Sequence, residues 1–566
     1  MMEMSLNGGS YMAIAIGIDN FEEVISNSSY IDKTEILLKI VNASKGTTFL
    51  FTRPRRFGKT LALSMMEYFF DETRKDSSSL FDNLSIATYP DIRNKHQNKY
   101  AVIHLNFKDI RGDNYQIEFD GIRSIISEQF KKFDYLKEQL EENDINYFKK
   151  IVNLDHANEQ DLGDSIYWLI KQINIKTNKD VIVLIDEYDS PIVRSRDNDH
   201  YEQIISFFRS FYGKIFKSNS HLYYGILTGV TQIAKESIFS GLNNLIVNNV
   251  LSIDKEYFAF SEKEVRYLLE KENIIDKLET IKEYYGNYIF GDNSNLYNPW
   301  SVLNYINNNA TIDYYWANTS ENNLIEEMVQ YSLNKDNILT ILFEIIQGNI
   351  RSYLNQSITF KDFMSSSSEE MLTLLIFSGY LSIKKKYSDL SYDICIPNLE
   401  LKTIFNREIN KRFISDISRQ YNFRLFDAFK NGDIDIIEDS LNQCLLNTFS
   451  SYEMKDEKSY QVMVLSLCSI AFKDHLVKSE QNVGEGRCDI IIYPSRDENI
   501  GIVIETKYYK SKVSETKLIE LANKAIAQIN NRRYYDEFDK FNPDKIIIFG
   551  FAFSKNKSKI IKEIIK

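Results

Sequence analysis

The sequence predicts an α/β protein of several domains, with a doubly wound parallel sheet in its N-terminal part and a smaller α/β domain at its C-terminus. Two apolar runs predict the first sheet: residues 47–52, which lead into a basic turn, and residues 181–185, which end in two acids. Continuous apolar runs are typical of strands that are buried on both faces of a parallel sheet. A chain of 566 residues is also too long for one hydrophobic core.

We expect three regions, at residues 1–250, 251–445 and 446–566. Residues 262–290 have helical spacing, and residues 320–440 alternate amphipathic helices with short strand-like pieces such as 380–387. The middle region is therefore predicted to be helical and winged-helix-like, and to connect two α/β domains. The content of 43% hydrophobic and 13% aromatic residues supports large cores and excludes a disordered chain.

Charge and composition exclude several classes of protein. A net charge of −12 argues against nucleic-acid binding along the whole surface. We see no apolar run of about 18 residues and no signal-peptide pattern, so we expect no membrane span and a cytoplasmic location. The four cysteines lie far apart, which fits a reducing compartment and gives little support for disulfides or a zinc site. The oligomeric state stays open, and a homo-oligomer is one of the alternatives.

The turn after the first apolar run has features of a phosphate-binding loop. Gly58, Lys59 and Thr60 fit the end of the pattern G-x-x-x-x-G-K-[ST], in which backbone N–H groups wrap the phosphates. A helix predicted at 60–73 would direct its positive end at them. Arg53 stands where the pattern has its first glycine. The triplet alone also fits an ordinary turn with an exposed lysine, so the loop by itself leaves phosphate binding open.

A second segment supplies the acids that such a loop requires. Asp186 and Glu187 end the strand predicted at 181–185. One carboxylate can join the coordination shell of Mg²⁺ while its neighbour orients or deprotonates the attacking water. Strands predicted at 100–107 and 222–229 and a helix at 201–216 continue the alternation of a doubly wound sheet.

These motifs resemble the AAA-ATPase-like proteins of many anaerobic microbes. The resemblance rests on RPRRFGKT (53–60), LIDEYDSPI (184–192), FRSFY (208–212), SIFSGLNNL (237–245) and YNPWSVLNYI (297–306). It implies that ATP is the ligand, that Thr60 and Asp186 hold its Mg²⁺, that Glu187 activates water and that Thr228 senses the γ-phosphate. Thr228 has the alternative of satisfying a strand end. The implied nucleotide-binding loop consists of Arg53, Pro54, Arg55, Arg56, Phe57, Gly58, Lys59 and Thr60.

Several basic residues near the loop have two interpretations. The three loop arginines could offset phosphate charge where the close approach of a glycine is lost, or they could pair with local acids such as Asp186 or Glu187. Arg209 could act as an arginine finger or could be an ion-paired surface residue. Tyr30, Asp32 and Lys33 are candidates for closing over the nucleotide base.

The C-terminal region carries a second set of charged residues. Asp489 heads an apolar strand predicted at 486–494, while Glu505 and Lys507 lie two apart on a strand that begins at 501 and so project from one face. Asp489 lies beside them if the two strands pair as a hairpin. Converging carboxylates repel unless a divalent cation joins them. The pattern therefore predicts a site for Mg²⁺ or Mn²⁺, with Lys507 orienting water or stabilising charge.

This order of residues resembles the PD-(D/E)xK nuclease fold. A helix predicted at 456–472 carries Glu457, which matches the glutamate of the family's E-x-x-Y-H pattern, whereas the histidine of that pattern is Gln461 here. A helix at 521–538 carries Gln528, and a strand follows at 545–553. The resemblance implies three metal ligands and two catalytic groups: the ligands are Glu457, Asp489 and Glu505, and the catalytic groups are Glu505 and Lys507.

Nucleic acid is the partner that this resemblance implies for the C-terminal domain. Residues 501–566 contain more Lys and Arg than Asp and Glu, which would favour contact with phosphates. Two main functions remain open. One is an ATP-binding protein, with ATPase activity, coupled to a metal-dependent nuclease-like domain. The other is a nucleotide-switched interaction protein whose nuclease-fold domain docks without cleaving; binding of nucleic acid without cleavage is a third alternative.

Overall fold

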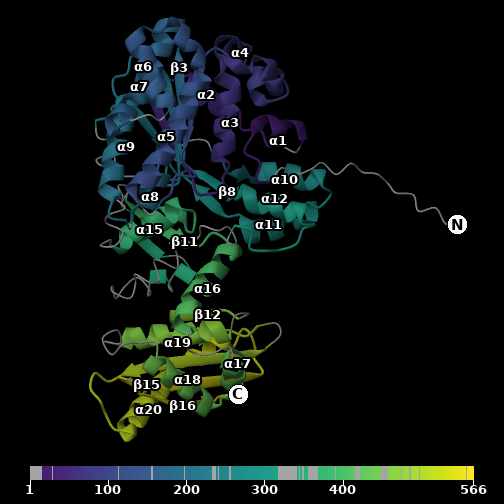
Figure 1. The fold of residues 1–566 in the computed structure, drawn as a ribbon. Helices are drawn as coiled ribbons and strands as arrows, with labels where there is room; N and C mark the ends of the chain where they lie inside the picture. The colour runs from purple at the N-terminus through teal and green to yellow at the C-terminus, as the bar shows by residue number, and fades with distance from the viewer. Residues whose placement is uncertain are drawn as a thin grey trace, which may run out of the picture. The chain divides into compact units, whose positions relative to one another are not determined.

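The computed structural model divides the chain into two compact units (Figure 1). Unit 1 comprises residues 1–320 and 351–401, and unit 2 comprises residues 321–350 and 402–566. The three regions expected from the sequence stay a prediction. The residues that the structure describes are 16–27, 30–112, 114–153, 157–196, 198–231, 238–239, 241–253, 256–316, 341–342, 345–346, 348, 350–354, 367–388, 390–414, 421–447, 457–472, 475–483, 486–495, 498–555 and 557–566.

A five-stranded parallel sheet organises the N-terminal part of unit 1. Its strand order is β5-β1-β4-β3-β2, and every neighbouring pair is parallel. The predicted strands at 47–52, 100–107, 181–185 and 222–229 are all present, and the short edge strand β5 was not anticipated. The bounds are β1 Thr47–Thr52, β2 Ala101–Asn106, β3 Val181–Asp186, β4 Leu222–Gly229 and β5 Leu245–Asn248.

Helices cover both faces of this sheet, which confirms the doubly wound fold (Figure 1). α3 (Lys59–Phe70) packs on β2, β3 and β4, while α7 (Glu159–Thr177) and α9 (Tyr201–Phe216) pack together on the other face. Aromatic residues of α9 fill that face, because Phe207, Phe208, Phe211 and Tyr212 are all buried. The remaining elements are α1 Phe21–Asn27, α2 Ile36–Val41, η1 Glu72–Phe81, η2 Ser85–Thr88, α4 Pro90–His96, α5 Tyr115–Lys132, η3 Asp134–Gln139, α6 Glu142–Val152 and α8 Ser190–Arg194.

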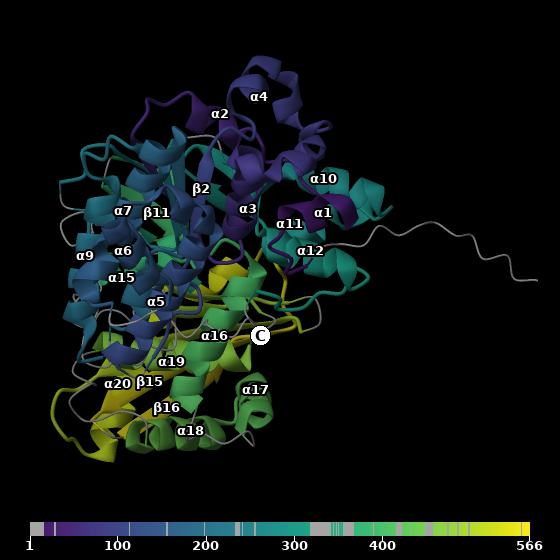
Figure 2. The ribbon, with the colours of Figure 1, turned by 45° about the horizontal axis from the view of Figure 1, so that its top comes forward.

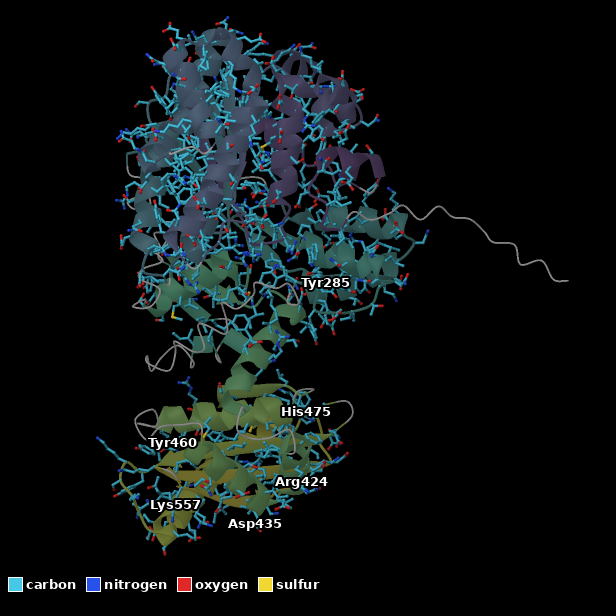
Figure 3. The ribbon with its side chains drawn as sticks, viewed as in Figure 1. Tyr285, Arg424, Asp435, Tyr460, His475 and Lys557 are labelled. Atoms are coloured by element: carbon cyan, nitrogen blue, oxygen red, sulfur yellow. The ribbon has the colours of Figure 1, made fainter. Side chains whose placement is uncertain are left out.

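A small helical module follows β5 in unit 1. Its helices α10, α11 and α12 lie together in both ribbon views (Figures 1 and 2). Their apolar faces meet in one core that includes Val265, Ile281 and Tyr285, the last of which is labelled in Figure 3. The elements are β6 Phe260–Ser261, α10 Glu262–Lys271, η4 Ile275–Lys277, α11 Leu278–Tyr285, β7 Tyr288–Phe290, β8 Asn293–Tyr297 and α12 Pro299–Asn307.

A three-stranded sheet of order β10-β11-β9 continues the chain. The strand-like piece predicted at 380–387 is present as β10. A helix precedes β10, and the long helix α16 follows β11, so helices and a small sheet alternate as expected for the middle region. The bounds are β9 Ile350–Tyr353, α15 Ser368–Phe377, β10 Ser382–Lys386, β11 Ser391–Cys395 and α16 Leu399–Ile414.

Unit 2 contains a mixed five-stranded sheet of order β12-β13-β14-β15-β16. β13 and β14 form the predicted antiparallel pair, whereas β14 and β15 are parallel. The strands β12 and β16 were not anticipated from the sequence. The predicted helix at 521–538 begins earlier and ends at Arg532, after which a 3₁₀ helix follows. The bounds are α17 Tyr421–Asn431, α18 Ile434–Asn447, α19 Glu457–Ala471, β12 Val477–Val483, β13 Gly486–Ile492, β14 Ile500–Tyr508, α20 Glu515–Arg532, η7 Tyr534–Phe538, β15 Lys545–Ser554 and β16 Lys557–Ile564.

The two faces of this sheet are covered by different helices. On one face, α20 and η7 bury Ile529 and Phe538 against strand residues such as Val503. On the other face, the ring of Tyr460 on α19, labelled in Figure 3, stacks on Phe553 at a centroid distance of 4.8 Å. This α/β arrangement is the fold class expected for the C-terminal region. No helix in the described part of the chain is long and apolar enough to cross a bilayer.

Candidate functional sites

The loop between β1 and α3 has the backbone of a phosphate cradle. Arg56 and Gly58 adopt left-handed conformations, with φ of 66° and 80°. Glycine adopts a left-handed conformation without strain, whereas Arg56 adopts it at some cost in backbone strain. Alternating left-handed residues turn successive N–H groups toward one concave face, and α3 begins directly at Lys59. The loop therefore presents N–H groups and a helix N-terminus together.

Lys59 is held within this loop. Its ammonium donates hydrogen bonds to the carbonyl oxygens of Arg53 at 3.0 Å and Pro54 at 2.9 Å. Burial lowers the pKa of Lys59, while the nearby carboxylates of Glu187 and Asp186 act in the opposite direction. The lysine thus lies between the loop and the acidic end of β3, where a phosphate chain would need a cation.

Arg53 lies in the interior of the protein, where its side chain has local partners. Its guanidinium is 1% exposed and contacts Glu256 at 2.8 Å. It also donates to the side-chain oxygen of Asn248 at 2.7 Å. Of the two interpretations of the loop arginines, the geometry of Arg53 favours pairing with an acid, but that acid is Glu256 and not Asp186 or Glu187. That acid precedes β6, in a segment that sequence reasoning did not connect with the loop.

Other residues of the loop contact aromatic residues of the segment that follows β5. Phe57 is fully buried, with its ring centroid 5.4 Å from that of Tyr288. Arg56 is exposed, and its guanidinium carbon lies 4.3 Å from the ring centroid of Trp300. Trp316 donates from its indole nitrogen to the carbonyl oxygen of Arg55 at 3.1 Å. The unusual loop sequence therefore anchors the phosphate loop to the helical module as well as shaping it.

We predict that Arg53→Met destabilises unit 1 by about 3 kcal/mol, because it leaves the carboxylate of Glu256 buried without its cation. The double variant Arg53→Met/Glu256→Gln should recover much of the loss. Thermal unfolding of the three proteins measures this. ATP affinity of the double variant then tests the other interpretation: an affinity loss despite recovered stability would assign the Arg53 side chain to phosphate binding.

The acidic end of β3 lies at the same sheet edge as the phosphate loop. Asp186 is fully buried, and Thr228 at the end of β4 donates its hydroxyl to Asp186 Oδ1. Asp186 Oδ2 has no hydrogen-bond partner among the described residues. A buried carboxylate oxygen without a partner is costly, and a cation would satisfy it. The residues present thus fit a nucleotide-bound Mg²⁺ near Asp186.

Glu187 has the environment of a proton acceptor. It adopts a left-handed conformation with φ of 51°. Burial raises the pKa of Glu187, and Asp186 and Asp189 act in the same direction, while Lys59 opposes them. A carboxylate with a raised pKa is a better base than one exposed to water.

Asp189 is a residue of this site that sequence reasoning missed. Its Oδ2 accepts hydrogen bonds from the backbone and the hydroxyl of Thr231, at 2.8 and 2.7 Å. Tyr188 donates its hydroxyl to the carbonyl oxygen of Thr231 as well. The D-E-Y-D segment therefore clamps the end of β4, which carries Thr228. The sequence did offer a signal for Asp189, because this acid follows Glu187 by only two residues.

A cavity opens beside the phosphate loop, inside unit 1. Its lining includes Tyr30, Arg56, Gly58, Leu61, Phe258 and Trp300. Of the three residues expected to close over a base, Tyr30 lines this cavity. Lys33 also lines it, but its ammonium is paired with Glu264 at 2.7 Å. Asp32 instead accepts hydrogen bonds from Ser85 and Thr34. Arg209 lies on the exposed side of α9, and neither of its two roles is tested by this placement.

The C-terminal site is built on the antiparallel pair β13–β14. Ile490 is paired with Ile504, so Asp489 and Glu505 occupy adjoining positions on the two strands. Asp489 Oδ2 accepts hydrogen bonds from the backbone N–H of Thr506 at 2.7 Å and from its hydroxyl at 2.6 Å. Burial raises the pKa of Asp489 despite these bonds. The predicted convergence of the two carboxylates is present.

Glu505 lies at the centre of this site. It is 2% exposed; its Oε1 accepts from Lys507 Nζ at 3.0 Å and from the side chain of Gln528. Its Oε2 has no hydrogen-bond partner among the described residues. Burial and the nearby Asp489 raise the pKa of Glu505 to about 7. Burial alone would lower the pKa of Lys507, but Glu505 and Glu457 outweigh burial and raise it.

Two helices complete the surroundings. Glu457, the first residue of α19, is half exposed, with its Oε1 3.6 Å from Lys507 Nζ. Gln461, which replaces the family's histidine, donates to the carbonyl oxygen of Asp489 at 3.2 Å.

Gln528 on α20 donates to Glu505, and so lies near the site as the resemblance implied. Tyr534 was not anticipated; it donates to the carbonyl oxygen of Arg487 at 2.6 Å.

The residues present fit a divalent cation held by two carboxylates. No group of three or more His, Cys, Asp or Glu side chains in the described part of the chain is arranged around a common point for a metal. Glu457 therefore stays a predicted ligand. The unsatisfied Oε2 of Glu505 and the mutual repulsion of Glu505 and Asp489 are what a cation would relieve. Mg²⁺ needs few protein ligands, because it retains several waters.

Comparisons with known proteins identify the two domains that carry these sites. Residues 15–239 match the family model described as a predicted AAA-ATPase, and residues 455–563 match the PD-(D/E)XK nuclease superfamily. The chain therefore joins an AAA-ATPase-like domain to a C-terminal domain of the PD-(D/E)XK nuclease superfamily. This confirms the resemblance seen in the motifs.

One curated relative matches along nearly its whole length. It is an uncharacterized protein from the 5′ region of vnfD in Azotobacter chroococcum mcd 1, 23% identical over 579 residues, with 98% of each chain covered. Among solved structures, the ORC2 protein of Aeropyrum pernix, in ADPNP-ADP complexes, covers 67% of this chain and 91% of its own. That match has 12% identity and a TM-score of 0.24.

Proposed function

We propose that this protein binds and hydrolyses ATP in its N-terminal domain, and that its C-terminal domain cleaves phosphodiester bonds of nucleic acid with Mg²⁺ or Mn²⁺, in the cytoplasm. One observation, made in both domains, carries the proposal: a buried carboxylate with an unsatisfied oxygen lies near a lysine. The two pairs are Asp186 with Lys59 and Glu505 with Lys507. Structural ion pairs do not need unsatisfied oxygens, whereas cation sites do.

In the N-terminal domain, each group has a separable task. The loop N–H groups and Lys59 bind the phosphates, and Asp186 and Thr60 hold Mg²⁺, which offsets the charge of the phosphate oxygens. Glu187 accepts a proton from the attacking water. We assign the sensing of the γ-phosphate to Thr228, whose hydroxyl donates to Asp186 Oδ1. The aromatic cavity lined by Tyr30 and Trp300 receives the base.

In the C-terminal domain, Asp489 and Glu505 hold the divalent cation, which supplies an activated water and stabilises charge on the phosphate. Lys507 places its ammonium beside Glu505 and orients water or offsets the developing charge. Gln528, on helix α20, donates to Glu505 Oε1. The other oxygen, Oε2, is then the atom that binds the cation. Gln461 supports the backbone at Asp489, which assigns it a positioning role.

Cleavage of labelled DNA and RNA, each single- and double-stranded, tests the proposal. With Mn²⁺, wild type should give products, and Asp489→Ala should reduce the rate by at least about 100-fold, because one of two cation ligands is lost. Lys59→Ala should alter the ATP dependence of cleavage only. No cleavage by wild type under any condition, with ATP still bound, would favour the nucleotide-switched interaction protein.

A further inference from the structure

A basic, aromatic hairpin in unit 1 has no task in either site. β10 (Ser382–Lys386) and β11 (Ser391–Cys395) are antiparallel, and β10 ends with three exposed lysines followed by an exposed tyrosine: Lys384, Lys385, Lys386 and Tyr387. β9, on the other side of β11, adds the exposed Arg351. The chain as a whole has a net charge of −12, so this concentration of positive charge is local.

The side chains at this hairpin are ordered against one another. The guanidinium carbon of Arg351 lies 3.7 Å from the ring centroid of Tyr387, and Lys385 Nζ lies 4.9 Å from the same centroid. Asp393 ties them together, because it accepts from Arg351 at 3.1 Å and from the hydroxyl of Tyr387 at 2.8 Å. Arg351 remains 59% exposed, so its charge still faces solvent.

The backbone also departs from a regular ladder at this point. Ile383 is paired with Ile394 and Lys385 with Asp393, so Lys384 is the extra residue of a bulge. A bulge redirects the side chains around it and increases the local twist of the strand. The three lysines therefore do not simply alternate between the two faces of a flat strand.

We propose that this basic hairpin, defined by Arg351, Lys384, Lys385, Lys386 and Tyr387, binds the phosphodiester backbone of nucleic acid. Lysine and arginine neutralise phosphates, and an arginine stacked on an aromatic ring keeps a fixed, exposed charge at little entropic cost. The choice of nucleic acid among polyanions rests on the proposed function of the C-terminal domain. The contact adds a binding surface on unit 1, whereas the cleavage site belongs to unit 2.

Protection of a sheet edge is the competing explanation. β10 is an edge strand, and edge lysines discourage pairing with other chains. Edge protection requires charge alone, and it does not require Arg351, Tyr387 and Asp393 to be joined on the neighbouring strands. The two explanations predict different results for nucleic-acid affinity.

The test is fluorescence anisotropy of labelled DNA and RNA duplexes of about 30 base pairs, in EDTA so that binding is measured without cleavage. The hairpin variant is Lys384→Gln/Lys385→Gln/Lys386→Gln. The matched control, Lys95→Gln/Lys171→Gln/Lys263→Gln, removes the same net charge from exposed positions on α4, α7 and α10. The single variant Arg351→Gln serves if the triple variant does not fold, as judged by thermal unfolding.

We expect the hairpin variant to bind at least about 10-fold more weakly, and the slope of log K against log salt to fall by about 2 to 3. Arg351→Gln should weaken binding about 3-fold, and the control should remain within about 2-fold of wild type. The DNA and RNA arms show which duplex the hairpin prefers. Unchanged affinity, equal losses in hairpin and control variants, or no binding by wild type would each overturn the proposal.

The outcome is independent of cleavage. If Asp489→Ala binds like wild type and no protein cleaves, the proposed nuclease activity fails while the hairpin proposal can still hold. If the hairpin variant binds like wild type and cleaves, the hairpin proposal fails and the nuclease activity stands.

Discussion

Glu505→Gln should make the metal-free protein more stable at pH 8, while it abolishes both stabilisation by Mn²⁺ and cleavage. The buried carboxyl of Glu505 has its pKa raised from an ordinary value of 4.5 to about 7, first by burial and then by Asp489. At pH 8 the native state must therefore hold a charge that it disfavours. The amide keeps an oxygen that can accept from Lys507 and Gln528, but it carries no charge.

The sign of the pH dependence follows from the raised pKa. Stability that the neutral carboxyl contributes is fully present below pH 4.5 and is lost as the pH rises through about 7. The advantage of Glu505→Gln should thus be near zero at about pH 4.5 and should level off above pH 7, at about 3 kcal/mol given roughly 1.4 kcal/mol for each unit of pKa. Thermal unfolding in EDTA between these pH values measures it.

Glu457→Gln is the matched control for this experiment. Because Glu457 is half exposed, its neutralisation should change the stability of the metal-free protein little. Its response to Mn²⁺ then decides whether Glu457 is a ligand, since a lost ligand reduces the stabilisation that the ion gives. A Glu505→Gln protein that is less stable than wild type at every pH would show that the carboxylate of Glu505 is structural.

At the ATPase site, Lys59→Ala and Glu187→Gln should fail in different ways. Lys59→Ala removes the cation that lies between the loop and the acids, and it also leaves the carbonyl oxygens of Arg53 and Pro54 without their donor. We expect at least a 100-fold loss of ATP affinity, or about 3 kcal/mol. Glu187→Gln removes the proton acceptor and leaves Lys59 with the carboxylate of Asp186, so ATP should still bind within about 3-fold while turnover falls about 100-fold or more.

Nucleotide-binding titrations and phosphate release, run on both variants, measure this difference. Arg209→Ala is the control, because Arg209 lies on the exposed side of α9, and we expect its turnover to stay within about 2-fold of wild type. Equal loss of binding in Lys59→Ala and Glu187→Gln would contradict the assignment of Glu187 to catalysis. A large loss of turnover in Arg209→Ala would instead support an arginine finger.

The sequence alone was sufficient for the fold class and for both sets of acids. Apolar runs such as 181–185 are typical of buried strands, and a carboxylate at the end of such a parallel strand lies at the sheet edge where loops converge. The shared face of Glu505 and Lys507 was also predictable, because side chains alternate along a strand. These are local relations, which depend on spacing along the chain.

Only the tertiary structure decided which charges meet. Arg53 stands at the first position of the phosphate loop, yet its partner Glu256 lies about 200 residues away, and no local spacing relates the two. In the same way, Asp393 brings Arg351 and Tyr387 into one stack on neighbouring strands, and Gln528 reaches Glu505 from a helix. Long-range contacts depend on how sheets and helices pack, because only packing brings distant carboxylates and cations within a few ångströms and removes the water between them.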